Sequence, residues 1–395
     1  MRFFHFTEQP YPDAWGEKSL RINIPNRLCD PQIASALYNR YLDEWLLADE
    51  LGFDIMLNEH HSTATCLAAS ITPFMSILAR QTRRARILAL GVPIANRADP
   101  VRVAEELALI DVISRGRVEM GFVKGVPFEV PVANLNPVRM VDRFWEAHDL
   151  ILKAMSNHEG PFRWEGEYFH YRSVNIWPRP FQSPYPPVWS TTLSVSSARE
   201  IARHGHVVAT VLTGFDAKQI FDSYRAGCVE YGRPVPGPDR FGYLALMATA
   251  GSEAEARRRG EIIRTYLHTS TTASSQFKVP PGYFSARDAG RMLKNPTLAR
   301  PVTLPAGGSV VLKTATLDQL IAAGIMFCGT PDQVHDQILR FDTAMGGVDN
   351  IMLMAQAGAL AHAEVADSIK VFSREVMPRL CDLQRAEPRL AATGT

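Results

Sequence analysis

The chain has 395 residues, of which 46% are hydrophobic, and its 42 Lys and Arg are balanced by 41 Asp and Glu. This length allows a large core but does not decide the number of domains, because barrels often exceed about 250 residues as one unit. Since no surplus of positive charge is available for a phosphate backbone or an anionic membrane surface, we expect neither nucleic acid nor a membrane as partner.

The five cysteines are widely spaced, and no Cys-x-x-Cys pair suggests a zinc site or a redox disulfide. The first residues lack the basic segment and apolar run of a signal peptide, and no apolar stretch reaches about 18 residues. We therefore expect a cytoplasmic enzyme.

Short apolar runs alternate with longer amphipathic stretches, which is the pattern of βα units repeated around a parallel sheet. Helices are predicted over 32–51 and 69–82, from Pro100, and in the charged segment 253–267. Eight runs are predicted as strands: 2–6, 53–57, 87–95, 118–122, 188–192, one that begins at His206, 240–251 and 350–356.

These elements predict an α/β fold, a (β/α)8 TIM barrel with insertions at its C-terminal mouth, as a single domain over residues 1–385. Alternating aromatic and polar residues over 162–172 predict an inserted β-hairpin. Residues 269–316 show no sustained period and are predicted to form a lid-like excursion, and 386–395 to form a disordered tail.

The second predicted strand ends in the most informative polar group of the sequence, Asn58-Glu59-His60-His61. Catalytic residues of such barrels lie just past the strand ends, where an imidazole can act as acid, base or hydrogen-bond donor. The alternative is a histidine that only caps or fills a loop. A shared metal ion is not predicted, because adjacent side chains on an extended segment point to opposite sides.

Several segments occur in the order typical of one family. Phe53-Asp54 is followed by Asn58-Glu59-His60-His61, by residues 85–125 and by the helix that contains Arg139 and Arg143, and then by residues 168–205 and 328–334. In this order the chain closely resembles the bacterial luciferase-like monooxygenases, and only 8–32 and 269–316 fall outside the likeness.

The resemblance implies a flavin-dependent monooxygenase that binds reduced FMN (FMNH2) at the barrel mouth and receives it from a separate flavin reductase. Reaction with O2 would give a flavin C4a-peroxide that oxygenates a small organic substrate. The cofactor would supply the difficult chemistry, and the protein the orientation, electrostatics and a dry pocket.

The family's catalytic histidine corresponds to His60, with Glu59 as a group that either orients the imidazole or accepts a neighbouring backbone N–H. The flavin phosphate would be held by Lys124 and, at a helix N-terminus, by Ser194 and Ser197, where free N–H groups and the helix dipole favour an anion. Ordinary N-capping is the alternative for these serines.

An arginine of the fourth predicted helix often joins the phosphate clamp in this family, and the likeness does not choose between Arg139 and Arg143. Either could instead pair with Asp142 or Glu146. The chain departs from the family at Leu193, where an acidic residue is common.

The flavin ring would pack at Gly91 and Val92, near which family members can carry an unusual cis peptide. The substrate would meet residues of the first and last strands. These are His5, Phe6, Met354 and Gln356.

Two other functions stay open on the same barrel. One is a dehydrogenase that transfers hydride to or from a deazaflavin, in which His60 would balance charge and no oxygen would be consumed. The other is a non-catalytic flavin-binding barrel. Dimers are frequent in the family, so we expect a homodimer.

Overall fold

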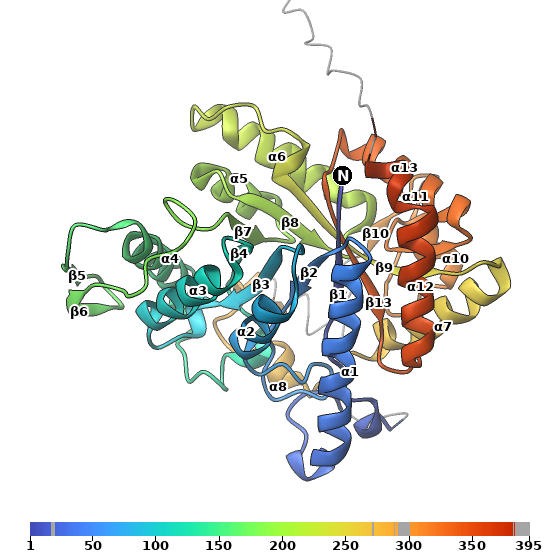
Figure 1. The fold of residues 1–395 in the computed structure, drawn as a ribbon, viewed down its shortest axis with the longest axis horizontal. Helices are drawn as coiled ribbons and strands as arrows, with labels where there is room; N and C mark the ends of the chain where they lie inside the picture. The colour runs from blue at the N-terminus through green and yellow to red at the C-terminus, as the bar shows by residue number, and fades with distance from the viewer. Residues whose placement is uncertain (17–19, 271, 288, 291–300, 382, 384–395) are drawn as a thin grey trace, which may run out of the picture.

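Eight parallel strands close into a barrel surrounded by helices in the computed structural model (Figure 1). The structure describes residues 1–16, 20–270, 272–287, 289–290, 301–381 and 383. The predicted tail at 386–395 lies outside the described residues. The barrel strands are β1 (Arg2–Thr7), β2 (Asp54–Leu57), β3 (Ile87–Pro93), β4 (Val118–Val123), β7 (Val188–Thr191), β8 (Val207–Val211), β9 (Phe241–Thr249) and β13 (Asn350–Gln356).

All eight predicted strands are present, so the predicted barrel is confirmed. Closure comes from parallel pairing of β13 with β1 and of β8 with β9. The strands are buried on both faces, as expected of a parallel sheet covered by helices, and this explains their almost uninterrupted apolar sequences.

The helices begin and end at residues that suit helix termini. Asp30 caps α1 and Asp99 caps α3, and a proline follows each cap. The helices are α1 (Pro31–Glu50), α2 (Ile71–Gln81), α3 (Pro100–Ser114), α4 (Met140–Ser156), α5 (Val195–His204), α6 (Ala217–Glu230), α7 (Glu253–Thr269), α8 (Ser275–Lys278), α10 (Leu317–Ala322), α11 (Pro331–Met345), α12 (His362–Glu375) and α13 (Met377–Cys381).

Within the described residues, three pairings of named strands lie outside the barrel. The predicted hairpin is formed by β5 (Phe162–Glu165) and β6 (His170–Val174), which extend beyond α4 at the left of Figure 1. The excursion contains a second small hairpin, β10 (Val302–Thr303) with β11 (Ser309–Val310). An unpredicted strand, β12 (Met326–Gly329), lies beside the last four residues of β9. A four-residue apolar run is too short for periodicity to identify.

The barrel interior is filled by side chains of alternate residues on each strand. Phe4 and Trp189 meet edge to face with ring centroids 5.8 Å apart. A Cβ atom at Gly242 would lie 2.8 Å from Cζ3 of Trp189, which explains why a glycine interrupts the apolar sequence of β9. The interior is therefore a packed core and not a pore.

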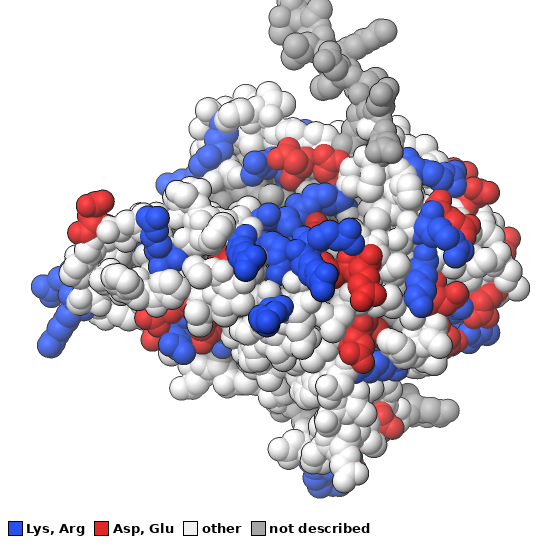
Figure 2. Space-filling view, viewed as in Figure 1, with Lys and Arg blue, Asp and Glu red and all other residues white. Residues whose placement is uncertain are grey.

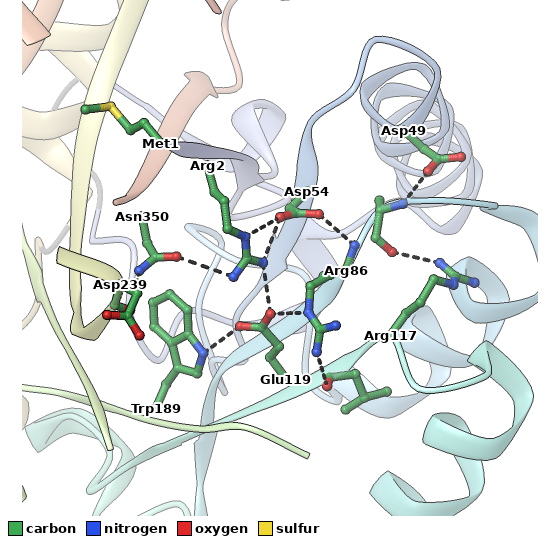
Figure 3. A network of polar contacts seen from close by, with 12 residues as sticks. Met1, Arg2, Asp49, Asp54, Arg86, Arg117, Glu119, Trp189, Asp239 and Asn350 are labelled. Carbon is green, nitrogen blue, oxygen red and sulfur yellow. Dashed lines mark hydrogen bonds and ion pairs between the residues drawn. The ribbon is translucent and has the colours of Figure 1, made fainter. Parts of the chain in front are cut away.

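A network of charged side chains closes the N-terminal end of the barrel (Figure 3). Arg2 donates to Asp54 at 2.7 Å and to Glu119 at 2.8 Å. Arg86 also donates to Glu119, and the indole N–H of Trp189 reaches the same carboxylate at 2.7 Å. With this end occupied by a stabilising network, the opposite, C-terminal end is where a site can form.

Both signs of charge lie close together on the molecular surface. Figure 2 shows a group of Lys and Arg near the middle of one face, with Asp and Glu beside it. Among the described residues, no helix combines the length and the apolar composition needed to cross a membrane.

Candidate active site at the C-terminal mouth of the barrel

His60 lies in the loop after β2 and is paired with a carboxylate from the loop after β4. Its Nδ1 lies 3.0 Å from Oε1 of Glu129, and because an ionised carboxylate only accepts, Nδ1 carries the proton. The backbone N–H groups of His61 and Val126 donate to the same carboxylate at 3.2 and 3.1 Å. Nε2 of His60 is thereby left as the ring nitrogen available to a ligand.

The pair has opposite effects on the two pKa values. Burial would lower the pKa of His60, but the hydrogen bond and charge of Glu129, with the charges of Glu8 and Glu59, raise it above its ordinary value. Burial would raise the pKa of Glu129, but His60 and the N–H of Val126 lower it. The arrangement therefore favours a protonated imidazole against an ionised carboxylate.

Glu129 was not predicted as a site residue because it lies in the segment Gly-Val-Pro-Phe-Glu-Val, which has the composition of an apolar loop. The structure forms it into a short 3-10 turn, η4 (Pro127–Glu129), and leaves Glu129 only 1% exposed. A carboxylate in so apolar a loop is the signal that could have identified it, since buried charges need partners.

Glu59, predicted beside His60, is engaged elsewhere. It accepts the backbone N–H of Ile71 at 3.0 Å and pairs with Arg97 at 2.5 Å. Nε2 of His61 lies 3.4 Å from it. Of the two roles considered for Glu59, its hydrogen bonds are those of the structural acceptor, and the contact that orients His60 comes from Glu129.

A second acid, Glu8, lies at the mouth just after β1 and was also missed. It accepts a hydrogen bond from the hydroxyl of Tyr266 on α7. Burial raises the pKa of Glu8, against the opposing influence of His60 and Tyr266. Glu8 and Glu129, the two carboxylates missed by the sequence prediction, thus differ in their tendency to ionise.

The residues predicted to hold a phosphate follow two neighbouring strands. Phe122 of β4 is opposite Ser190 of β7, so Lys124 and the N-terminus of α5 follow adjacent strand ends. Nζ of Lys124 lies 4.0 Å from the ring centroid of Tyr283, and burial lowers the pKa of the amine. Within the described part of the chain, no carboxylate pairs with Lys124, which leaves a half-buried cation at the strand end beside the one that leads to α5.

The α5 N-terminus combines capping with exposure. Ser194 caps the helix by accepting the N–H of Ser197 at 3.5 Å, and its hydroxyl lies 2.8 Å from that of Ser196. All three serines are exposed. Capping therefore occurs, and it leaves these hydroxyl groups accessible to an anion.

The two arginines near the start of α4 point to different surroundings. Arg139 is exposed and pairs with Asp142 and Glu167. Arg143 donates to the backbone carbonyls of Ala95 and Arg97 at 3.0 and 2.8 Å and stacks on Phe169. Arg143 thus supports the loop after β3, whereas Arg139 lies on the surface.

At Gly91 and Val92 the β3–β4 pairing shifts by one residue, and the peptide bond between Leu90 and Gly91 is cis. A Cβ atom at Gly91 would lie 2.5 Å from Cγ1 of Val123. The close approach of the two strands at this point requires glycine.

The four residues predicted to meet substrate fall on two sides of the barrel wall. Phe6 and Met354 are register partners and, by alternation from Phe4, face the interior. His5 and Gln356 face the surrounding helices, where Gln356 donates to Glu44 of α1. His5 is fully buried, and burial lowers its pKa to about 4.

Buried polar atoms at the mouth have unused hydrogen-bonding capacity. Within the described residues, the side chains of Gln9, Asn96 and Thr191 have buried polar atoms without a partner. These residues follow β1, follow β3 and end β7, so they lie at the C-terminal rim. Since unpaired buried polar groups are rare, the rim fits a ligand rich in donors and acceptors, as a flavin is.

The described part of the excursion reaches this rim. The hydroxyl of Tyr283 donates to the carbonyl oxygen of Gly125 at 2.7 Å, directly after Lys124. A segment far from β4 in sequence therefore covers the cation at the end of β4.

A family model and several known proteins match this chain. A family model described as luciferase-like monooxygenase matches residues 22–347. The chain is 32% identical to protein y4wF of Sinorhizobium fredii and 26% identical to the oxygenase component of the flavin-dependent trigonelline monooxygenase of Acinetobacter baylyi, over 49% and 52% of its length. These alignments span 57% and 58% of the two relatives, less than two thirds of each. The alkanal monooxygenase alpha chain of Photorhabdus luminescens is 24% identical over 86% of this chain and 90% of that protein.

Solved structures share the fold at low sequence identity. The oxygenating constituent of 3,6-diketocamphane monooxygenase from Pseudomonas putida, in complex with FMN, matches with a TM-score of 0.71 at 19% identity, over 96% of this chain and 98% of that one. An F420-dependent secondary alcohol dehydrogenase matches with a TM-score of 0.63 at 17% identity, over 85% and 93% of the two chains.

Proposed function

The chain belongs to the luciferase-like monooxygenase family, and from this premise we propose that it is the oxygenase component of a two-component flavin-dependent monooxygenase. It takes reduced FMN from a separate flavin reductase and uses O2 to oxygenate a small organic substrate. The observation that carries the proposal is the His60–Glu129 pair, which lies at the same end of the barrel as the unpaired rim groups that a flavin would satisfy.

His60 is the proposed catalytic residue, and Glu129 is its positioning residue. With Nδ1 held by Glu129 at 3.0 Å, Nε2 is the atom at which a proton is given or taken. The raised pKa of His60 keeps that proton available near neutral pH. General acid–base help of this kind contributes typically ~10^2 to 10^4 in rate.

Lys124 and the N-terminus of α5 are the proposed phosphate site. The amine is half-buried without a carboxylate partner in the described residues, and Ser194 and Ser197 are exposed at a helix end whose N–H groups attract anions. We propose that Arg143 supports the site indirectly, because it binds carbonyl groups of the loop after β3. Arg139 is not included in the proposed phosphate site, because it pairs with acidic residues on the surface.

The ring of the flavin is proposed to lie against Gly91 and Val92, with Gln9, Asn96 and Thr191 within reach of its polar edge. When bound, reduced FMN supplies the electrons that activate O2. The apolar substrate pocket is proposed to include Phe6 and Met354 and to be covered by the lid-like excursion that carries Tyr283.

The reductase partner is supported by the relative from Acinetobacter baylyi, which is named as an oxygenase component. A homodimer is supported by an exposed apolar stripe, since Leu109, Val112 and Ile113 of α3 and Ile77 of α2 are 37% to 48% exposed. Light scattering of the purified chain tests this state.

A deazaflavin-dependent dehydrogenase is the second candidate function, favoured by the structural likeness to F420-dependent enzymes. On that alternative, the same His60 would balance charge during hydride transfer, and no oxygen would enter the product.

The test is oxygen incorporation. The protein is supplied with a flavin reductase, NADH, FMN and 18O2 and offered a panel of aldehydes, ketones, alkenes and N-heterocycles, and products are read by mass spectrometry. We expect one labelled oxygen atom in a product with the wild type and at most about a hundredth of that product with His60→Ala. Unlabelled product, or equal turnover by His60→Ala, would contradict the proposal.

A further inference from the structure

Three histidines far from the barrel mouth converge outside the barrel wall. His148 lies in the middle of α4, His204 is the last residue of α5, and His206 directly precedes β8. Each offers a ring nitrogen, and these nitrogens all lie within 4.8 Å of one another. We propose that this three-histidine cluster binds a divalent transition-metal ion of the zinc type.

The distance between the Nε2 atoms of His148 and His206 is already close to that between two ligands of one metal ion. Nε2 of His148 lies 3.2 Å from Nε2 of His206. Zinc binds imidazole nitrogen at about 2.0–2.1 Å, so two nitrogens in a tetrahedral site are about 3.4 Å apart. Both side chains are buried, at 1% and 5% exposure, which limits their alternatives to this geometry.

The Nδ1 atoms of the same two rings have polar partners, as the ring nitrogens of metal-bound histidines that do not bind the ion usually have. Nδ1 of His148 lies 2.8 Å from a carboxylate oxygen of Asp149, and Nδ1 of His206 lies 3.3 Å from Oγ of Ser190. Such second contacts fix the ring so that Nε2 points at the ion, and they commonly accompany histidine ligands.

His204 provides the third ligand. Its ring stacks on Trp145, with centroids 4.3 Å apart and planes 11° apart, and its centroid is 4.9 Å from that of His148. Because 4.8 Å exceeds a ligand separation of about 3.4 Å, the ring must turn toward the other two. His204 is less buried than the other two histidines, so its ring is the freest of the three to turn, and a water molecule would complete four ligands.

The charges around the cluster set how tightly a cation binds. The carboxylate of Asp149 favours it, whereas Arg233, which donates to the carbonyl of Arg203 beside the cluster, opposes it. Without an ion, the polar atoms from Ser190 through both buried histidines to Asp149 can form a continuous chain of hydrogen bonds. The metal-bound cluster and the metal-free, hydrogen-bonded cluster are therefore the two states that an experiment must distinguish.

The consequence of an ion would be structural. It would join α4 to the C-terminal end of α5, the end opposite the proposed phosphate site, and so fix the helix that Ser194 caps. The sequence spacing conceals the site, because His148 is 56 residues before His204 and the two meet only when α4 packs beside α5 and β8.

The experiment uses untagged full-length protein, dialysed against Zn2+ or Co2+ and analysed for bound metal, for visible Co2+ absorption and for Tm. We expect one ion per chain, intense absorption bands typical of tetrahedral Co2+, and a Tm raised by the metal. His148→Gln, His204→Gln and His206→Gln each lower the affinity at least about tenfold, whereas the matched control His170→Gln, an exposed histidine of β6, binds as the wild type does.

No stoichiometric binding by the wild type, or equal binding by His204→Gln and the wild type, would overturn the proposal and leave the hydrogen-bonded chain as the role of the cluster. His204 is partly exposed, so its variant keeps the test valid if the two buried variants fail to fold. An Arg233→Gln variant gives an independent check, because removal of the opposing charge strengthens binding.

Discussion

Replacement of Glu129 by glutamine perturbs the contact on which the proposed role of His60 depends. Glu129 accepts three hydrogen bonds, one from the His60 ring and two from backbone N–H groups. Glutamine has nearly the same shape but only one accepting oxygen and no charge. The variant therefore weakens the pair without opening a cavity.

The magnitude follows from the burial of both partners. The carboxylate is almost inaccessible and the imidazole is 23% exposed, so solvent screens the pair little. Hydrogen bonds to charged groups contribute about 1.5–3 kcal/mol, against about 1 kcal/mol for neutral ones. We expect Glu129→Gln to lower the free energy of unfolding by about 1–2 kcal/mol while His60 is protonated.

The loss depends on pH in a defined direction. Because the pKa of His60 is raised on folding, the stability from its charged form is present below its ordinary pKa of 6.5 and is lost as pH rises through the raised folded pKa. The pKa of Glu129 is lowered, so this carboxylate stays ionised throughout that window. The difference between wild type and variant is thus greater at about pH 6 than at about pH 9.

Urea unfolding at the two pH values measures this difference. Glu146→Gln is the matched control, because Glu146 accepts backbone N–H groups of Glu167, Tyr168 and Phe169 and, among the residues that the structure describes, has no histidine partner. Its loss of stability should not change between the two pH values. A loss in Glu129→Gln that is the same at both would refute the reasoning.

Three further predictions follow from other contacts. Lys124→Ala should weaken binding of reduced FMN by about 10- to 100-fold and leave riboflavin binding unchanged, in a fluorescence titration, because only FMN carries the phosphate; equal losses for both ligands would argue against a phosphate contact. Glu119→Ala should cost about 1–3 kcal/mol in urea unfolding, since it leaves the buried Trp189 N–H without its acceptor, while Arg2 keeps Asp54 and both arginines are about a third exposed; a cost below about 0.5 kcal/mol would contradict that view. Burial lowers the pKa of His5 to about 4, so His5 takes up a proton when the chain unfolds in acid and should contribute a fall in stability of about 3 kcal/mol as pH drops from 6.5 to about 4. Burial also lowers the pKa values of His204 and His206, so His5→Leu should reduce the total fall by about 3 kcal/mol without abolishing it; a variant with the slope of the wild type would contradict this role of His5.

The strands could be predicted because parallel strands buried on both faces leave a plain apolar signal. Because catalytic residues are expected at the C-terminal ends of barrel strands, these strands predicted His60 as a site residue, and His60 does lie at the mouth. The resemblance added Lys124 and Ser194, and the register of β4 against β7 brings them to adjacent strand ends.

The partners of those residues could not be predicted, because they come from loops whose position depends on the whole fold. Glu129 and Glu8 occur in segments without periodicity, and Tyr283 belongs to the excursion outside the likeness. Likewise, alternation along β1 places the side chains of His5 and Phe6 on opposite sides of the strand. It does not say which of the two faces the barrel interior. Local pattern identifies strand ends but not the side chains that meet across them.

The measurement that tests the central claim most directly is an anaerobic titration of the protein with reduced FMN and, in parallel, with a reduced deazaflavin, followed by admission of oxygen. We expect micromolar binding of reduced FMN, weakened by Lys124→Ala, and uptake of oxygen by the complex at a rate that His60→Ala changes. Binding of the deazaflavin alone, with no oxygen consumed, would contradict the central claim and assign the chain to hydride transfer.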